Sequence, residues 1–291
     1  MNIEFSFSKQ VSECSCEHIF SKFYYWFKDY NLNHNITYFD YSQSRLGPFQ
    51  TPSATIKNLD NNKYMVISYW DRAFDIVSPP VPHPDKCVNI ITSSGVHEDK
   101  FNSWGVHYQN VNIIPFSYSP YKMNFERYIG TNTISFDEKK DSDLLFRGYQ
   151  YDKRKDMSLI SPNNFTEERL NDLSYYGELN KSKICLSLDG AGITCHRDME
   201  ILGVGSVLLR PELSQKFHNP LIPDYHYVSV ENVLDPKLQW ELIVNKFNEI
   251  KNNNDFLRFI SSNGKKWFDE NGTVNSNVNI LKELVKIEDL L

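Results

Sequence analysis

The stretch "KICLSLDGAGITCHRDMEILGVGSVLLRP", residues 183–211, is the most informative part of the sequence for the fold, because its pattern predicts a complete strand–helix–strand unit. The apolar run 183–188 predicts a buried strand, and the run 206–211 predicts a second one. Residues 197–205 carry apolar side chains at helical spacing and end in the glycine break "GVG". Two strands joined by a helix pair in parallel through a right-handed crossover. The stretch therefore predicts an α/β fold.

The same alternation of apolar runs and helical patterns continues on both sides of this stretch. Further strands are predicted at 64–68, 87–92, 111–116, 143–148 and 226–230, and helices at 12–30, at 166–176 behind a Thr166 cap, and over most of the chain after 235. A chain of 291 residues suits two α/β domains. The polar segment 130–142 divides the chain into an N-terminal domain, 1–135, and a C-terminal domain, 136–291.

Composition and charge exclude several classes of protein. The net charge of -6 disfavours a nucleic-acid partner, because binding to a phosphate backbone needs a basic surface. No apolar run is long enough to span a membrane, and the first residues, MNIEFSFSKQ, lack the pattern of a secretory signal. The five cysteines lack the paired spacing of a zinc site, so we expect free thiols and no metal. These features predict a cytoplasmic protein, and none of them indicates an oligomeric state.

A phosphate-binding edge is predicted where the strand 183–188 ends. In open α/β sheets, ligands bind beyond the carboxyl ends of the strands, near helix N-termini. Here the strand is followed by Asp189, Gly190 and Gly192, and small residues let backbone N–H groups approach a phosphate. Arg197, at the start of the helix, adds a fork of donors to the positive helix end. The alternative interpretation is an ordinary strand-to-helix turn.

A second group of cations follows the strand 143–148. Arg147 and Gly148 end that strand, and Arg154 comes a few residues later. The carboxyl ends of parallel strands meet at one edge of a sheet, so we expect Arg147 or Arg154 to help Arg197 neutralise a phosphate group.

Three other residues are candidates for contacts with the rest of a nucleotide-sugar. Glu200 lies three residues after Arg197 and on nearly the same helix face, where it either holds ribose hydroxyls or pairs with the arginine. His226 and Tyr227 begin the strand 226–230. They either line the donor pocket or have a structural role.

The order of these motifs resembles a known family. The chain from "DLLFRG" to "PLIPDYHYVSV", residues 143–230, is similar to the C-terminal half of the family 90 glycosyltransferases, which include protein O-glucosyltransferases and capsule-associated proteins. A weaker similarity extends to exostosin-like transferases. The residues that carry the resemblance are Phe146, Arg147, Gly148, Asp189, Gly190, Arg197, Gly205, Ser206, Val207, Phe217 and the run 221–228.

This resemblance implies a GT-B-like fold, in which two Rossmann-like domains face a central cleft. It implies that the C-terminal domain holds a UDP-sugar donor and that the N-terminal domain holds a glycan acceptor. It also implies an inverting transfer that needs no metal or other cofactor. The implied activity is the transfer of xylose or glucose from a UDP-sugar to an oligosaccharide, a glycoprotein or a capsule.

The resemblance also implies a catalytic base. The family places an aspartate after a strand of the first domain, and "YMVISYWDRAFD" offers Asp71, with Asp75 in reserve. The alternative is that Asp71 pairs with Arg72 or caps a helix. Trp70, Trp104, His107 and Tyr108 are candidate contacts to the acceptor through stacking on sugar faces, with core packing as the alternative.

The chain departs from the family in two ways. Arg154 lies one position nearer to the FRG motif than is usual, and the secretory signal and retention tail of animal members are missing, which favours a cytosolic protein. A retaining enzyme is disfavoured, because Glu200 and Glu212 are separated by a strand. The competing function is a nucleotide-sugar or glycan-binding protein without catalysis, and the requirement for Asp71 distinguishes the two.

Overall fold

The computed structural model describes residues 2–8, 33–39, 53–68, 86–92, 96–97, 112–115, 123–138, 144, 146–147, 153–160, 165–166, 170–189, 195–213, 215–216, 218–284 and 286–290. The chain divides into two compact units. Unit 1 comprises 1–121, 214–220 and 274–291, and unit 2 comprises 122–213 and 221–273. These units differ from the domains 1–135 and 136–291 expected from the sequence. Unit 2 begins before α4 (Met123–Thr131), which packs on α6 (Asp172–Lys181), and the last 18 residues belong to unit 1.

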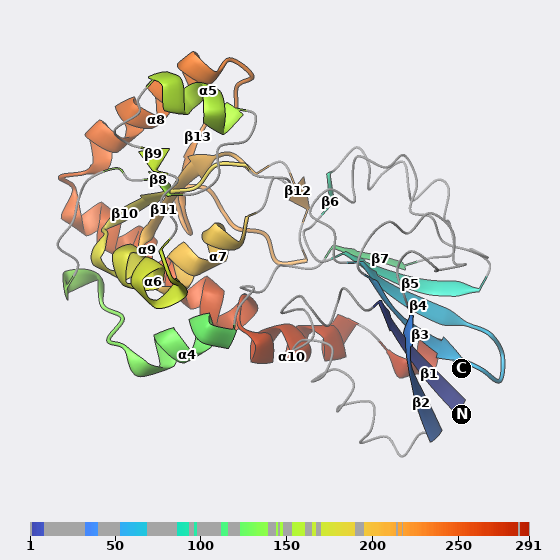
Figure 1. The fold of residues 1–291 in the computed structure, drawn as a ribbon. Helices are drawn as coiled ribbons and strands as arrows, with labels where there is room; N and C mark the ends of the chain where they lie inside the picture. Colours follow the sequence, from blue (N-terminus) through green and yellow to red (C-terminus); the bar gives the residue numbers. More distant parts are fainter. Residues whose placement is uncertain are drawn as a thin grey trace. The chain divides into compact units, whose positions relative to one another are not determined.

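Unit 1 is built on a mixed six-stranded sheet with the strand order β2-β1-β3-β4-β5-β7 (Figure 1). Its strands are β1 (Asn2–Ser8), β2 (Asn33–Phe39), β3 (Ser53–Asn58), β4 (Tyr64–Ser68), β5 (Cys87–Thr92) and β7 (Asn112–Pro115). β3 runs antiparallel to both of its neighbours, while β1 pairs with β2, and β5 with β4 and β7, in parallel. The predicted strands at 64–68, 87–92 and 111–116 are confirmed, whereas the first three strands were not predicted.

The C-terminal segment of the chain contributes to unit 1. It contains α10 (Val274–Leu284) and a short 3₁₀ helix, η4 (Ile287–Leu290). Leu290 is fully buried, and its carbonyl oxygen accepts hydrogen bonds from the side-chain amides of Asn58 and Asn61, each at 2.8 Å. Asn58 ends β3 and Asn61 lies in the turn before β4, so the last residues of unit 1 are held by its β3–β4 turn. A two-residue ladder of β6 (Val96–His97) with β12 (Gln215–Lys216) also belongs to this unit.

Unit 2 contains the strand–helix–strand unit predicted from 183–211. β10 (Ile184–Leu186), β11 (Val207–Pro211) and β13 (Val228–Val230) form a parallel sheet in the order β10-β11-β13. Helix α7 (His196–Gly203) connects β10 to β11. It ends at Gly203, and Gly205, two residues later, has a φ of 62°, a conformation that glycine adopts most readily. The prediction of parallel strands joined by a helix is confirmed here.

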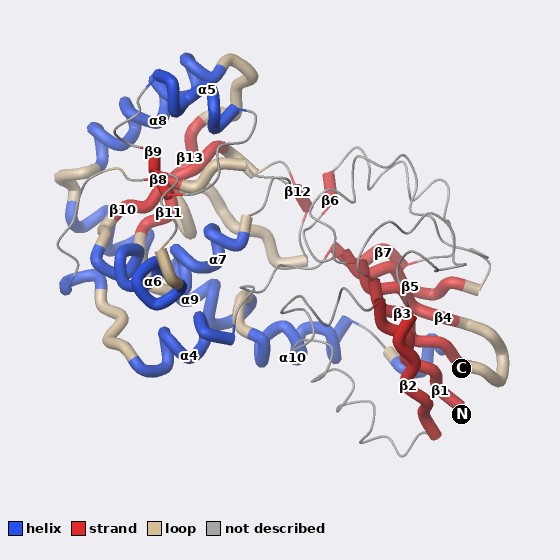
Figure 2. The backbone as a smooth tube through the Cα atoms, viewed as in Figure 1, coloured by secondary structure: helices blue, strands red, loops and turns tan. Residues whose placement is uncertain are grey.

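Helices cover both faces of this small sheet (Figure 2). One apolar cluster joins the sheet to α5 (Lys153–Ile160), α8 (Pro236–Ile250) and the start of α9 (Asn254–Asn271). A second cluster joins the other face to α4, α6, α7 and the end of α9. β11 contributes Val207 and Leu209 to the first cluster and Leu208 to the second, as expected for alternating side chains of a strand buried on both faces.

The prediction of a helix at 166–176 was wrong about the residue at which the helix begins. Thr166 does not cap a helix; it lies in β9 (Phe165–Thr166), which pairs in parallel with β8 (Phe146–Arg147). The helix is α6, and its cap is Asn171, whose side chain accepts a hydrogen bond from the Ser174 N–H at 2.9 Å. Asparagine and threonine both cap helices well, so the local pattern offered two starts, and pairing with β8 decided between them. The predicted helix 12–30 lies outside the described residues.

Candidate functional site

The candidate site lies at the carboxyl edge of the parallel sheet in unit 2. Asp189 follows β10, Cys195 is the N-cap of α7, and Arg210 lies near the end of β11. The N–H of Cys195 donates to Asp198 Oδ2 at 2.9 Å, so the first turn of α7 is capped by its own aspartate. This is the edge at which open α/β sheets bind ligands.

Arg197 occupies the second position of α7 and is held over an aromatic ring. Its Cζ lies 4.3 Å from the centre of the Phe146 ring, a distance typical of a cation–π contact, and its Nη2 donates to the Arg147 carbonyl. Nε and Nη1 are buried, and neither has a hydrogen-bond partner among the described residues. Buried donors are nearly always paired in folded proteins, so these two nitrogens make Arg197 a candidate for binding a ligand.

Arg154 lies on the same aromatic ring as Arg197. It is 6% exposed, its Cζ is 5.2 Å from the centre of the Phe146 ring, and its Nη2 donates to the Leu188 carbonyl at 2.5 Å and to Cys195 Sγ at 3.2 Å. Burial lowers the pKa of Arg154, and the nearby charge of Arg197 also lowers it. The structure thus brings together two of the three arginines that the sequence assigned to a phosphate group.

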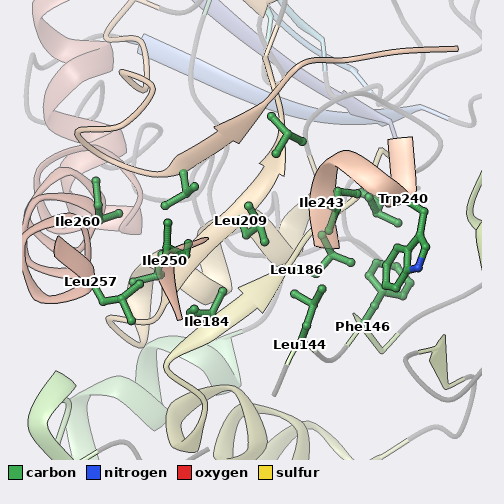
Figure 3. Packing of buried hydrophobic residues seen from close by; sticks show 14 of the residues in the cluster. Leu144, Phe146, Ile184, Leu186, Leu209, Trp240, Ile243, Ile250, Leu257 and Ile260 are labelled. Atoms are coloured by element: carbon green, nitrogen blue, oxygen red, sulfur yellow. The ribbon is translucent and has the colours of Figure 1, made fainter. Parts of the chain in front are cut away.

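Phe146 itself is anchored in the core of unit 2. It is fully buried in the first apolar cluster, which also contains Leu144, Leu186 and Trp240 (Figure 3). A ring fixed in this way gives the guanidinium of Arg197 a rigid support. The FRG segment therefore contributes a platform as well as a cation, which the sequence did not indicate.

The third expected cation, Arg147, has a carboxylate partner. Its Nε and Nη2 donate to the two carboxylate oxygens of Glu178 at 2.5 and 2.7 Å, a bidentate ion pair between β8 and α6. The side chains of Arg147 and Glu178 are 16% and 28% exposed. The backbone of Arg147 supports Arg197, while its side chain is engaged by α6.

Arg210 is part of the site and was not singled out from the sequence. It is fully buried and donates from Nη1 to Asp198 Oδ2, from Nη2 to Asp189 Oδ1 at 3.0 Å, and from Nε to the Pro211 carbonyl at 3.0 Å. Burial acts to lower the pKa of Arg210, but the charges of Asp198 and Asp189 raise it above its ordinary value. The available signal was a charged residue inside the apolar run "SVLLRP", because arginine is almost never fully buried unless it is paired.

Buried Glu200 and partly buried Tyr175 form a pair next to Arg197. The Tyr175 hydroxyl donates to Glu200 Oε2 at 3.1 Å, and Glu200 is 8% exposed. Burial raises the pKa of Tyr175 well above its ordinary value, and the Glu200 carboxylate raises it further, so the phenol keeps its proton. Burial acts to lower the pKa of Arg197, but Tyr175 and Glu200 outweigh it. The sequence left two roles for Glu200: holding ribose hydroxyls or pairing with Arg197. The structure shows the contact with Tyr175 and an electrostatic interaction with Arg197, and a contact with ribose stays a prediction.

The Cys195 thiol at the N-cap of α7 is not activated as a nucleophile. Burial raises its pKa to about 11, and the charge of Asp198 adds to that effect. Its Sγ lies 3.3 Å from the Leu188 carbonyl and accepts from Arg154. Because the thiolate is the nucleophilic form, Cys195 is a polar contact in this site rather than a reactive group.

His226 and Tyr227 lie in the turn before β13. Tyr227 is 1% exposed in the second apolar cluster, and its hydroxyl accepts from the Leu213 N–H at 3.4 Å. His226 Nδ1 accepts from the Ile222 N–H at 2.9 Å, and burial lowers its pKa. Both residues have structural contacts here, and a contact of either with a ligand stays a prediction.

The remaining sequence candidates lie outside the described residues. They are Trp70, Asp71, Asp75, Trp104, His107, Tyr108, Gly148, Gly190 and Gly192. Asp71, the predicted base, is therefore assigned by sequence alone.

Comparison with known proteins gives no family for this chain. A search of protein-family models found no match, and a search of curated proteins found none. Within the described part of the chain, no helix is long and apolar enough to cross a membrane. In the same part, no three His, Cys, Asp or Glu side chains converge as a metal site would require.

Proposed function

We propose that this protein is an inverting glycosyltransferase that moves glucose or xylose from a UDP-sugar to a glycan acceptor without a metal. In this proposal the two units form a GT-B-like pair of Rossmann-like domains, and unit 2 binds the donor. The observation that carries it is Arg197, whose Nε and Nη1 are buried without a partner among the described residues at the N-terminus of α7. The motif order that resembles family 90 enzymes supports it as well.

The charges of the site favour a diphosphate as the ligand. Arg197 and Arg154 contact the Phe146 ring, and the hydrogen bonds given above lead from these two arginines to neutral acceptors. The positive end of α7 adds to their field. The carboxylate of Asp198 also lies at this helix end, and it pairs with Arg210, which Asp189 shares. The cation of Arg197 therefore acts at a helix end whose own acid already has a cationic partner.

The proposed reaction uses one base and one leaving group. The oxygen of an acceptor hydroxyl attacks the anomeric carbon of the donor, and the bond from that carbon to the diphosphate oxygen breaks. The hydroxyl proton passes to the carboxylate of Asp71, and the electron pair of the broken bond stays on UDP. Arg197 and the N-terminus of α7 stabilise the charge that develops on the diphosphate. Attack from the face opposite UDP inverts the anomeric configuration.

A protein that binds a nucleotide-sugar or a glycan without catalysis is the second candidate. The buried arginines would serve such a protein equally well, since they bind the diphosphate whether or not the sugar is transferred. Asp71 separates the two functions, because only the transferase needs a base.

The test is a panel of UDP- and GDP-sugars incubated with the protein and EDTA, with hydrolysis or transfer as the readout. We expect turnover of one UDP-sugar by the wild type, loss of turnover in Asp71→Asn, and unchanged thermal stabilisation of both proteins by UDP. Binding by the wild type without any turnover would favour the second candidate. If no nucleotide stabilises the wild type, the transferase and the nucleotide-sugar-binding protein are both wrong, and only a glycan-binding protein that does not use Arg197 for phosphate is left.

A further inference from the structure

Arg210 is a charged residue in the central strand of the small parallel sheet. β11 lies between β10 and β13, and all five of its residues are buried. Placing an arginine there costs free energy, because the guanidinium leaves water, and only close carboxylates and further hydrogen bonds offset that cost. All three nitrogens of Arg210 have acceptors. Because each of these nitrogens is already engaged within the protein, Arg210 acts through its partners.

The two carboxylates that Arg210 holds come from different elements. Asp189 follows β10, and Asp198 lies in the first turn of α7. The guanidinium of Arg210 therefore fixes the end of β10 and the first turn of α7 relative to β11. These are the elements that form the carboxyl edge of the sheet.

Asp198 links Arg210 to the backbone of α7. Its Oδ2 accepts from Arg210 Nη1 and also from the N–H of Cys195. Arg197 lies between Cys195 and Asp198 in the chain, so its backbone belongs to the turn that this carboxylate closes. The direction of the Arg197 side chain depends on that turn, because its guanidinium must meet both the Phe146 ring and the Arg147 carbonyl.

We propose that Arg210 is a positioning residue, which orients Arg197 toward the phosphate groups of the ligand by holding Asp198 and Asp189. This inference rests on the proposed function, because it takes the ligand of Arg197 to be a nucleoside diphosphate. Arg210 itself touches neither the nucleotide nor the sugar. Its role is to keep the first turn of α7 in the conformation that presents Arg197.

The test uses a variant that removes the buried charges as a pair. Arg210→Met alone leaves Asp198 unbalanced in the core, so it is combined with Asp198→Asn, which keeps an oxygen acceptor for the Cys195 N–H. Arg258→Met is the matched control, because Arg258 is an exposed arginine of the same unit that pairs with Asp137. For each protein the dissociation constants of UDP and of uridine are measured, together with hydrogen exchange of the amides in 195–200.

We expect the double variant to bind UDP about 10-fold to 100-fold more weakly, the range seen when residues that orient metal ligands are removed. Uridine, which lacks phosphate, should bind as it does to the wild type, and the amides of 195–200 should exchange faster. The control should match the wild type in all three measurements. A merely structural role would weaken both ligands equally, and that result would overturn the inference.

Failure of the inference and failure of the proposed function give different results. If the wild type binds UDP and the double variant binds it equally well, or exchanges its 195–200 amides at the wild-type rate, Arg210 does not position Arg197. If the wild type does not bind UDP more tightly than uridine, the proposed function is wrong and the inference about a phosphate ligand is overturned with it. Faster exchange in the variant would then show only that Arg210 holds the turn.

Discussion

Helices α7 and α9 pack against each other and against β11, yet they carry their charges in opposite ways. In α7, Asp198 and Glu200 are buried, and Arg197 has two buried nitrogens. In α9, the cations are exposed or, like Lys265, partly exposed, and they pair with acids on the surface, as Lys265 does with Asp269 four residues later. Buried charge costs stability unless it is fully paired, while surface pairs contribute little. The buried charges of α7 therefore depend on partners inside the unit, whereas the charges of α9 depend little on theirs.

The largest expected effect comes from removing the buried cation. Arg210→Met should lower the free energy of unfolding by about 3 to 5 kcal/mol, because Asp198 is left buried without its partner. Urea unfolding followed by circular dichroism measures the change. The same substitution at Arg258 of α9 should cost less than about 1 kcal/mol, since that pair is exposed. Equal losses at the two sites would break the comparison between the helices.

The next effect separates binding from stability. Arg197→Met should weaken UDP binding by about 10-fold or more, equivalent to roughly 1.4 kcal/mol, since it removes the charged donors proposed for the diphosphate. Stability should fall less than in Arg210→Met, because losing the Phe146, Arg147 and Glu200 interactions is partly offset by removing the buried donors Nε and Nη1. Isothermal titration calorimetry and thermal unfolding give the two quantities. A large loss of stability with unchanged UDP affinity would make Arg197 a structural residue.

A smaller effect depends on pH and concerns the turn that faces α9. Burial lowers the pKa of His226, while Glu270 of α9 acts in the opposite direction. Its stabilising contribution is therefore complete above the unfolded value of about 6.5, and is lost as the pH falls toward the lower folded pKa. Protonation of Nδ1 would also end the hydrogen bond from Ile222. Between about pH 7.5 and pH 5, the wild type should lose more stability than His226→Gln.

Thermal unfolding at a series of pH values measures this difference. Glu270→Gln should make the pH effect of His226 larger, because the group that opposes the shift is gone. If His226→Gln and the wild type lose stability in parallel over this range, the histidine has the same pKa in the folded and unfolded chains.

The smallest effect belongs to the surface of α9. Lys265→Ala should change the free energy of unfolding by only about 0.3 to 0.5 kcal/mol, the usual value for a pair four residues apart on a helix. The change should shrink further in high salt, which screens exposed charges. A salt-independent loss of more than about 1 kcal/mol would mean that α9 uses its charges as α7 does.

The parts of the fold that were predictable from sequence are those with a mainly apolar pattern. β4, β5, β10 and β11 are such runs, interrupted by Asn89 in β5 and Arg210 in β11, and a strand buried throughout, as β10 and β11 are, needs no further signal. β1 was missed because "NIEFSFS" alternates apolar with polar residues over only seven positions, inside a segment rich in polar side chains. Its pairing partners lie far along the chain, and no local pattern shows them.

The candidate site was predictable only where neighbours in sequence are neighbours in space. Arg197 was placed correctly at the start of a helix after a strand, because the helical spacing and the glycines are local signals. Its support by Phe146 and the pairing of Arg147 with Glu178 depend on how β8, α6 and α7 meet. Arg210 was overlooked for the same reason: its partners are in other elements.

The hydrogen bonds from Asn58 and Asn61 to the Leu290 carbonyl tie the last described residues to unit 1. This connection affects the order in which the parts of the protein can fold during synthesis. Unit 1 needs residues 274–291, whereas unit 2 ends at Thr273. During synthesis, all of unit 2 therefore leaves the ribosome before the last part of unit 1. Domains generally fold as units, beginning at the N-terminus as the chain emerges. In this chain unit 2 is complete before residues 274–291 are made, so the six-stranded sheet of unit 1 gains that segment only after all of unit 2 has been synthesised.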